Sequence, residues 1–197
     1  KYLKEYKAEF PDAPEFIYAN TPSYQGTHAD GFHEAVAATV RSLAKRTKKD
    51  THINLFPGMY SPADLRYLKR VMDNYKTNYV LLPDYSETLD GSSWSEYKKI
   101  PDGGTSKEAI ATTADAQASI EFGAIFNKAG GSSRDKAGRS KETAASYLET
   151  AFGVPAIRLP WPVGVEATDL FFKTISEVTG IEKPDEYVKE RGRLIDA

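Results

Sequence analysis

The sequence predicts an α/β fold, a Rossmann-like three-layer α/β/α domain with a mainly parallel sheet of about four to five strands. Two observations carry this prediction. Short apolar runs alternate five times with segments of helical periodicity, and most of the apolar runs end at proline, glycine or an Asp/Ser-rich stretch. Because such alternation is typical of βαβ units, we expect parallel strands with helices on both faces of the sheet.

The expected strands are short enough to be told from helices by their length. They are the apolar runs at residues 15–20, 52–58, 79–85, 118–126 and 155–162. Helices are expected between and around them, at residues 1–10, about 30–46, 61–76, about 106–117, 142–152 and 166–180, and from Pro184 onward. Ligands of such sheets collect at the carboxyl ends of the strands, so the segments that follow the strands are the places to look for a site.

The helix at 61–76 has the clearest signals. Ser61 can cap its start, Pro62 suits the first helical position, and Asp64 lies in the first turn, where the helix dipole favours a negative charge. Apolar residues recur every three or four positions along it. Gly153 and Gly180 are expected to end two later helices.

Composition excludes several classes of protein. Lysine plus arginine nearly balance aspartate plus glutamate, for a net charge of -2, so neither nucleic acid nor an anionic membrane is an expected partner. The chain has no cysteine, which excludes disulfides and thiolate metal sites made by this chain alone. No apolar run is long enough to cross a membrane, and no signal peptide opens the chain.

The two ends suggest a piece of a longer protein, because the chain starts without methionine and stops within an apparent helix. We expect an N-terminal helical segment and linker at residues 1–15 and a Rossmann-like domain at 16–182. Residues 183–197 would begin a helix that leads to a further domain.

Two candidate motifs have ordinary explanations. The loop at 127–141 is rich in glycine and basic residues, but Gly131 and Gly138 are too far apart for a phosphate-binding P-loop. Asp84, Glu87 and Asp90 could together bind a cation, although turns and helix caps use the same residue types.

The stretch from Thr21 to His28 carries many hydroxyl groups and an imidazole directly after an expected strand. His28 could act as a ligand or base, or could be a hydrogen-bonded structural residue. Ser23 has no Asp–His arrangement readable around it, which speaks against a hydrolase. From the residues alone, the sequence does not lead to a reaction.

Several segments of the sequence resemble those of a known protein family. The segments "NTPSYQGTHADGF", "INLFPGMYSPADLRYLKRVM", "LLPDYSETLDG", "GVEATDLFF" and "KERGRLIDA" occur in this order. Together they are similar to the β chain of nitrogenase component 1, the molybdenum-iron protein family. The pattern TPS-aromatic-x-G-[ST]-H near the start and ERGRL-x-D at the end are the most specific parts.

The resemblance implies the middle, Rossmann-like domain of a three-domain β subunit. In the family, β pairs with the nitrogenase α chain in an α2β2 heterotetramer in the cytoplasm. An 8Fe-7S P-cluster relays electrons from the ATP-driven iron protein to the cofactor that reduces N2 to ammonia. The isolated piece is expected to be inactive and to hold no cofactor by itself.

The same resemblance implies roles for four residues. Ser23 matches the serine whose hydroxyl oxygen binds a P-cluster iron when the cluster is oxidised. Gly26 and His28 match neighbouring positions that orient the ligands. Asp196 matches an aspartate that helps bind a divalent cation between the two β subunits, with its partner residue lying beyond Ala197. No catalytic residue is expected in this chain.

Three alternatives remain at this point, the first being a vanadium or iron-only relative of component 1. A related branch of the family consists of scaffold subunits that assemble the iron–molybdenum cofactor, and these are expected to lack the serine of the TPS motif more often. The chain could also be a non-enzymatic α/β ligand-binding or regulatory domain that only shares the fold.

Overall fold

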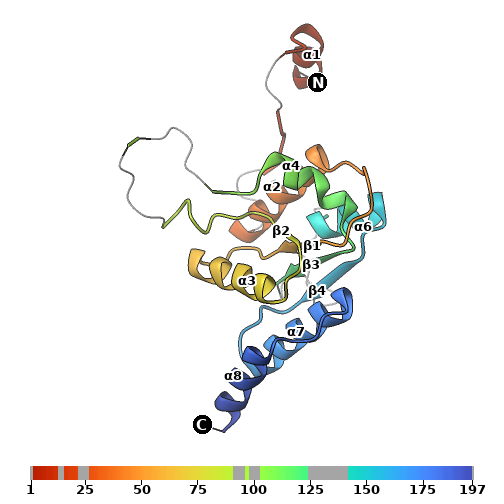
Figure 1. Cartoon of the computed structure of the whole chain (residues 1–197). Coiled ribbons are helices and arrows are strands. Elements are labelled where there is room, and N and C mark those ends of the chain that lie inside the picture. Colours follow the sequence, from red (N-terminus) through yellow and green to blue (C-terminus); the bar gives the residue numbers. More distant parts are fainter. Residues whose placement is uncertain are drawn as a thin grey trace.

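The computed structural model describes residues 2–12, 16–21, 27–90, 96–97, 103–123 and 142–196 (Figure 1). Its centre is a four-stranded parallel sheet with the strand order β2-β1-β3-β4. The strands are β1 Ile53–Phe56, β2 Tyr79–Leu81, β3 Ala118–Phe122 and β4 Ala156–Leu159. The chain leaves β1 toward β2 on one side and later returns to β3 on the other, so the strand order reverses between β1 and β3. Such a switch point is where ligands usually bind in parallel α/β sheets.

Helices cover both faces of the sheet, which confirms the three-layer prediction. One face packs against α2 His28–Leu43, α4 Lys107–Thr112 and α6 Ala144–Phe152, with the short 3-10 helix η1 Thr113–Asp115 after α4. The other face packs against α3 Pro62–Asn74, α7 Val165–Thr179 and α8 Asp185–Ile195. Helix α1 Tyr2–Glu9 lies apart from these layers in Figure 1.

Strand β1 shows why the sheet needs both layers of helices. All four of its residues are buried, and successive side chains point to opposite faces. Ile53 and Leu55 join the cluster beneath α3 and α7, whereas Phe56 joins the cluster beneath α2 and α6. A strand that is buried on both sides is typical of a parallel sheet between two layers of helices.

Four of the five expected strands are present, and the fifth expectation is wrong. Residues 16–20 form no strand, and Phe16, Ile17 and Tyr18 are exposed by 40%, 40% and 69%. No strand of the sheet pairs with this run. An apolar run forms a strand only where a neighbouring strand is present to accept and donate its backbone hydrogen bonds. The helix expected from about residue 30 also begins earlier, at His28.

The helix-end signals at α3, α6 and α7 are confirmed. Ser61 and Asp64 form a capping box at the start of α3, with Pro62 in the first turn. Gly153 and Gly180 end α6 and α7 in the left-handed conformation, at φ values of 68° and 72°, which glycine adopts without steric cost. Across the described residues, no helix is both long and apolar enough to cross a membrane.

Candidate functional site

The predicted iron ligand lies in a stretch that the structure does not describe. Ser23 and Gly26 belong to residues 22–26, outside the described ranges. The structure therefore describes what flanks this stretch, Thr21 before it and Thr27 after it. The contacts of Thr27 and of the first turn of α2 fix the position of the backbone immediately after residues 22–26.

The start of α2 is fixed by a capping box between Thr27 and Asp30. The Asp30 carboxylate accepts hydrogen bonds from the Thr27 backbone N–H at 2.6 Å and from the Thr27 hydroxyl at 2.9 Å. The Thr27 hydroxyl oxygen in turn accepts the backbone N–H of Asp30 at 3.3 Å. Asp30 is only 6% exposed, so this cap is anchored in the interior. It holds the chain immediately after residues 22–26.

His28 is the first residue of α2 and is exposed. It directly follows the capping threonine, which places it beside the predicted site stretch in the chain. The exposure leaves the imidazole accessible to a partner or ligand. The structure does not bring His28 into a cluster of other titratable residues that could hold a metal, within the part of the chain it describes.

His33 is the residue of this region that the sequence reasoning did not single out. A Cβ added at Gly58, just beyond β1, would lie 3.6 Å from His33 Nε2 and 3.7 Å from the carbonyl oxygen of Phe122, at the end of β3. The imidazole therefore lies against the switch point between β1 and β3. Burial lowers the pKa of His33, although the Asp30 charge partly opposes the shift. Sequence spacing could have indicated His33, because a residue three positions after Asp30 lies on the same face of a helix as Asp30.

Tyrosines tie the loops at the same edge of the sheet together. The Tyr85 hydroxyl accepts the backbone N–H of Tyr60 at 2.9 Å and donates to the carbonyl oxygen of Tyr60 at 2.6 Å. The Tyr60 ring packs on Trp161, with 4.3 Å between ring centroids. Burial raises the pKa of the Tyr60 hydroxyl, and the charge of Asp64 adds to the shift. The segments after β1, β2 and β4 thus form one connected edge.

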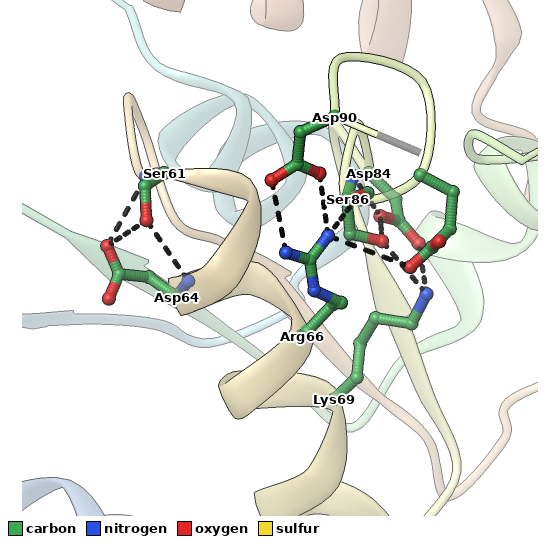
Figure 2. Close-up of polar contacts among 8 residues, drawn as sticks. Ser61, Asp64, Arg66, Lys69, Asp84, Ser86 and Asp90 are labelled. Carbon is green, nitrogen blue, oxygen red and sulfur yellow. Dashed lines mark hydrogen bonds and ion pairs between the residues drawn. The ribbon is translucent and has the colours of Figure 1, made fainter. Parts of the chain in front are cut away.

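For Asp84, Glu87 and Asp90 the structure favours turn chemistry over a cation site. The Asp84 carboxylate accepts the backbone N–H of Ser86 at 3.0 Å, and basic side chains of α3 pair with the carboxylates (Figure 2). Arg66 binds both carboxylate oxygens of Asp90, at 2.7 and 3.1 Å, and also donates to the carbonyl oxygen of Ser86 at 2.5 Å. The Lys69 ammonium lies 2.9 Å from the carboxylate of Asp84. These pairs neutralise the carboxylates that a metal ion would need.

The pKa shifts of this cluster agree with ion pairing. The hydrogen bond from Arg66 holds the pKa of Asp90 below its usual value. Partial burial by itself would raise the pKa of Asp84, but hydrogen bonds from Ser86 and Lys69 together lower it. The cluster therefore anchors the segment after β2 to α3, and both carboxyl groups are ionised at neutral pH.

Asp196 lies on a different part of the fold from His28. It is the exposed C-cap of α8, and its backbone N–H donates to the Gly192 carbonyl oxygen at 3.0 Å. Helices α8 and α2 pack on opposite faces of the sheet (Figure 1). The structure therefore presents Asp196 and His28 as two separate surface positions.

Comparison with known proteins identifies the family. The family model described as nitrogenase component 1 type oxidoreductase matches residues 1–197. The molybdenum-iron protein beta chain of Clostridium pasteurianum is 37% identical over 187 residues, which is 94% of this chain and 38% of that relative. The cofactor biosynthesis protein NifN of Bradyrhizobium diazoefficiens is 28% identical over 204 residues, 100% of this chain and 40% of NifN.

A solved structure gives the same result. The structure titled nitrogenase Cp1 at pH 6.5 superposes with a TM-score of 0.84 and 36% identity, covering 98% of this chain and 41% of that one. This chain therefore spans about two fifths of the length of the relatives it matches. The family model, the relatives and the superposed fold agree: the chain belongs to the nitrogenase component 1 type oxidoreductase family.

Proposed function

We propose that this chain is part of a β subunit of nitrogenase component 1, which helps hold the P-cluster and passes electrons from the iron protein to the N2-reducing cofactor. The observation that carries the proposal is the TPS motif with Ser23, which precedes α2 in the sequence of a chain 37% identical to a molybdenum-iron protein beta chain. The capping box at Thr27 and Asp30 supports it, because that box fixes the chain where the motif ends.

The donor groups of this chain fit a partial contribution to an iron–sulfur cluster. With no cysteine, the chain offers hydroxyl, imidazole and carboxylate groups but no thiolate, so the cluster's thiolates would come from elsewhere. The Ser23 oxygen would be a hard donor, suited to the more oxidised iron, and would lose its proton on binding. Gly26 and His28 would flank this ligand and help to position it.

We further propose that Asp196 supplies one carboxylate to a divalent cation between two β subunits. Its place as the exposed C-cap of α8 supports this role, since the carboxylate is accessible to a second subunit. The other partners in this proposal are the nitrogenase α chain and the iron protein, in the cytoplasm. Residues 1–15, 16–182 and 183–197 would be linker, central domain and the start of the connection to the next domain.

A second candidate is a scaffold subunit for cofactor assembly. The match to NifN over the whole chain favours keeping it. The serine of the TPS motif separates the two candidates, because an iron ligand at Ser23 is needed only where the chain holds a P-cluster. The ligand-binding domain that only shares the fold is contradicted by the family match over residues 1–197.

A segment exchange tests the proposal. In the molybdenum-iron protein of Clostridium pasteurianum, the matched beta-chain segment is replaced by this chain, and in a control by the matched NifN segment of Bradyrhizobium diazoefficiens. We expect the first chimera to assemble with the α chain, acquire the P-cluster and retain N2 reduction, and the NifN chimera to lose it. If both chimeras assemble without a P-cluster signal, the β-subunit proposal is wrong and the scaffold candidate gains.

The isolated 197-residue chain gives an independent check. Because it has no thiolate ligands, we expect iron analysis of the purified chain to find no stoichiometric iron. Stoichiometric iron would show that these residues form a complete metal site. That result would contradict the partial contribution proposed for Ser23.

A further inference from the structure

Two segments that resemble the family, GVEATDLFF and KERGRLIDA, meet in the fold through one ion pair. The first segment supplies Asp169 on α7, and the second supplies Arg191 on α8. The Arg191 Nε–H donates to Asp169 Oδ2 at 2.6 Å, which is the short distance of a charge-assisted hydrogen bond. The pair therefore fastens the middle of α8 to α7.

The same carboxylate also holds the turn that leads into α8. The Lys183 ammonium lies 3.8 Å from Asp169 Oδ1, in the stretch between the last residue of α7 and the first of α8. It also lies 5.8 Å from the centre of the Phe172 ring, within the range of a cation–π contact. Asp169 thus uses one oxygen for the turn and the other for the helix, and so fixes the direction in which α8 runs.

The start of α8 has a separate anchor. The Tyr187 ring stacks on Phe172 with 4.7 Å between ring centroids, and the Tyr187 hydroxyl accepts a hydrogen bond from the Asn74 side chain at 2.8 Å. Within the described part of the chain, Arg191 is the last residue of α8 whose side chain makes a hydrogen bond or ion pair. It is therefore the polar anchor nearest to Asp196.

The end of α8 is open to a second subunit. Asp196 is exposed there, and carboxylate oxygens suit divalent cations such as Ca²⁺ and Mg²⁺. One helical turn earlier, a Cβ added at Gly192 would meet no atom within 4 Å. Nothing described in the chain therefore blocks this side of the helix just before the carboxylate.

The distance from anchor to carboxylate shows why Asp169 matters. Without the Arg191 pair, the next anchor is Tyr187, nine residues before Asp196, or about 13.5 Å along a helix that rises 1.5 Å per residue. A tilt of about 5° around Tyr187 would then move Asp196 by about 1 Å. Metal–ligand distances tolerate only about 0.2 Å, so a cation would sense this movement.

We propose that Asp169 is a positioning residue for the divalent cation that Asp196 helps to bind between two β subunits. The inference rests on the ligand role proposed above for Asp196. Asp169 does not touch the cation: it holds Arg191 and Lys183, and through them sets where α8 presents its last carboxylate. Because ion pairs between partly exposed groups add little stability, the role shows in cation affinity rather than in folding.

Manganese binding to the Clostridium pasteurianum chimera tests the proposal. After divalent cations are removed with a chelator, Mn²⁺ is titrated by EPR and Tm is recorded for each variant. Asp169→Asn keeps the size of the side chain but loses its charge, and should weaken Mn²⁺ binding at least about threefold, less than the loss of a direct partner of a ligand. Its Tm should change by no more than about 2 °C.

Two further variants are matched to this one. Asp169→Glu keeps the carboxylate and should bind Mn²⁺ as the unsubstituted chimera does. Glu177→Gln removes another carboxylate of α7, whose partner Lys173 lies 3.7 Å away on the same helix, and should leave Mn²⁺ binding unchanged. If Asp169→Asn binds Mn²⁺ no more weakly than Glu177→Gln, the proposal is overturned.

Asp196→Asn separates this inference from the ligand role on which it rests. It should weaken Mn²⁺ binding more than Asp169→Asn does, since it removes the ligand itself. If Asp196→Asn weakens binding and Asp169→Asn does not, the ligand role stands and the positioning role of Asp169 is wrong. If Asp196→Asn binds Mn²⁺ unchanged, both are wrong.

The 197-residue chain by itself decides the matter if the chimera does not assemble. Asp169→Asn should speed the hydrogen exchange of the backbone amides in residues 189–196 and leave exchange in the four strands unchanged. Glu177→Gln should leave both unchanged. Exchange in residues 189–196 that is equal in Asp169→Asn and the wild type would show that Asp169 does not hold α8.

Discussion

Asp30 and Thr27 hold the first turn of α2 through a reciprocal set of hydrogen bonds. The Asp30 carboxylate accepts the backbone N–H and the hydroxyl of Thr27, and the Thr27 oxygen accepts the backbone N–H of Asp30. Asp30 is buried, so the cap is part of the domain interior. The pair sits immediately after residues 22–26 and links the proposed ligand motif to the fold.

The first prediction concerns this cap. Thr27→Ala removes the hydroxyl from the capping box, and we expect the free energy of unfolding to fall by about 1 kcal/mol. Thr39→Ala in the same helix is the control, because the Thr39 hydroxyl bonds the Ala35 carbonyl oxygen within the helix, away from the cap. Its effect should stay within about 0.5 kcal/mol. Urea unfolding measures both, and equal effects would show that the box does not stabilise α2.

The cap also shows what sequence patterns could and could not predict. Ser61 and Asp64 were readable as a helix start because Pro62 and a regular apolar stripe follow them. Thr27 and Asp30 have the same spacing, but no proline follows Thr27, and a glycine at position 31 weakens the helical signal. The start of α2 was therefore expected two residues too late.

The second prediction concerns the anchor between α3 and the segment after β2. Arg66→Lys keeps the charge but cannot bind both oxygens of Asp90 and the Ser86 carbonyl at once. We expect faster hydrogen exchange of the backbone amides in residues 84–90, with exchange in the sheet unchanged. Arg41→Lys is the control, because it makes the same change at an exposed arginine of α2 that pairs with Glu34 and Glu142. Unchanged exchange at residues 84–90 would contradict the anchoring role.

The third prediction concerns a buried carboxyl group. Glu121 on β3 is 2% exposed, and its Oε2 accepts the Thr143 hydroxyl at 2.9 Å. Its Oε1 is buried with no hydrogen-bond partner among the described residues. Burial raises the pKa of Glu121, although the Thr143 hydrogen bond and the charge of Arg158 oppose the shift.

The sign of the pH effect follows from that shift. A group with a raised pKa in the folded protein contributes its full stability below the ordinary glutamate pKa of 4.5, and the contribution is lost as pH rises through the raised value. Glu121→Gln cannot ionise, so the stability of this variant relative to the wild type should grow as the pH rises above 4.5. Glu182→Gln at an exposed position is the control. If the difference in the free energy of unfolding between Glu121→Gln and the wild type does not change with pH, the pKa of Glu121 is not raised.

Alternation of apolar runs was sufficient to predict the sheet, because β1, β2, β3 and β4 each have a neighbour to pair with. The apolar pattern of residues 16–20 could not show that this run forms no strand, since strand pairing depends on distant parts of the chain. The site was less predictable. The lysine and arginine that neutralise Asp84 and Asp90 come from α3, 15 and 24 residues away in sequence, and His33 reaches the switch point only through the packing of α2.

The most direct test of the central claim is an EPR measurement on the oxidised P-cluster in the assembled chimera. Ser23→Ala removes the one oxygen ligand proposed for this chain, and Ser42→Ala, whose hydroxyl bonds the Ala38 carbonyl oxygen within α2, is the control. We expect Ser23→Ala to change the EPR signal of the oxidised cluster but to leave the reduced cluster and the assembly of the protein unchanged. We expect Ser42→Ala to leave all three unchanged. An oxidised-state signal identical in wild type and Ser23→Ala would contradict Ser23 as an iron ligand.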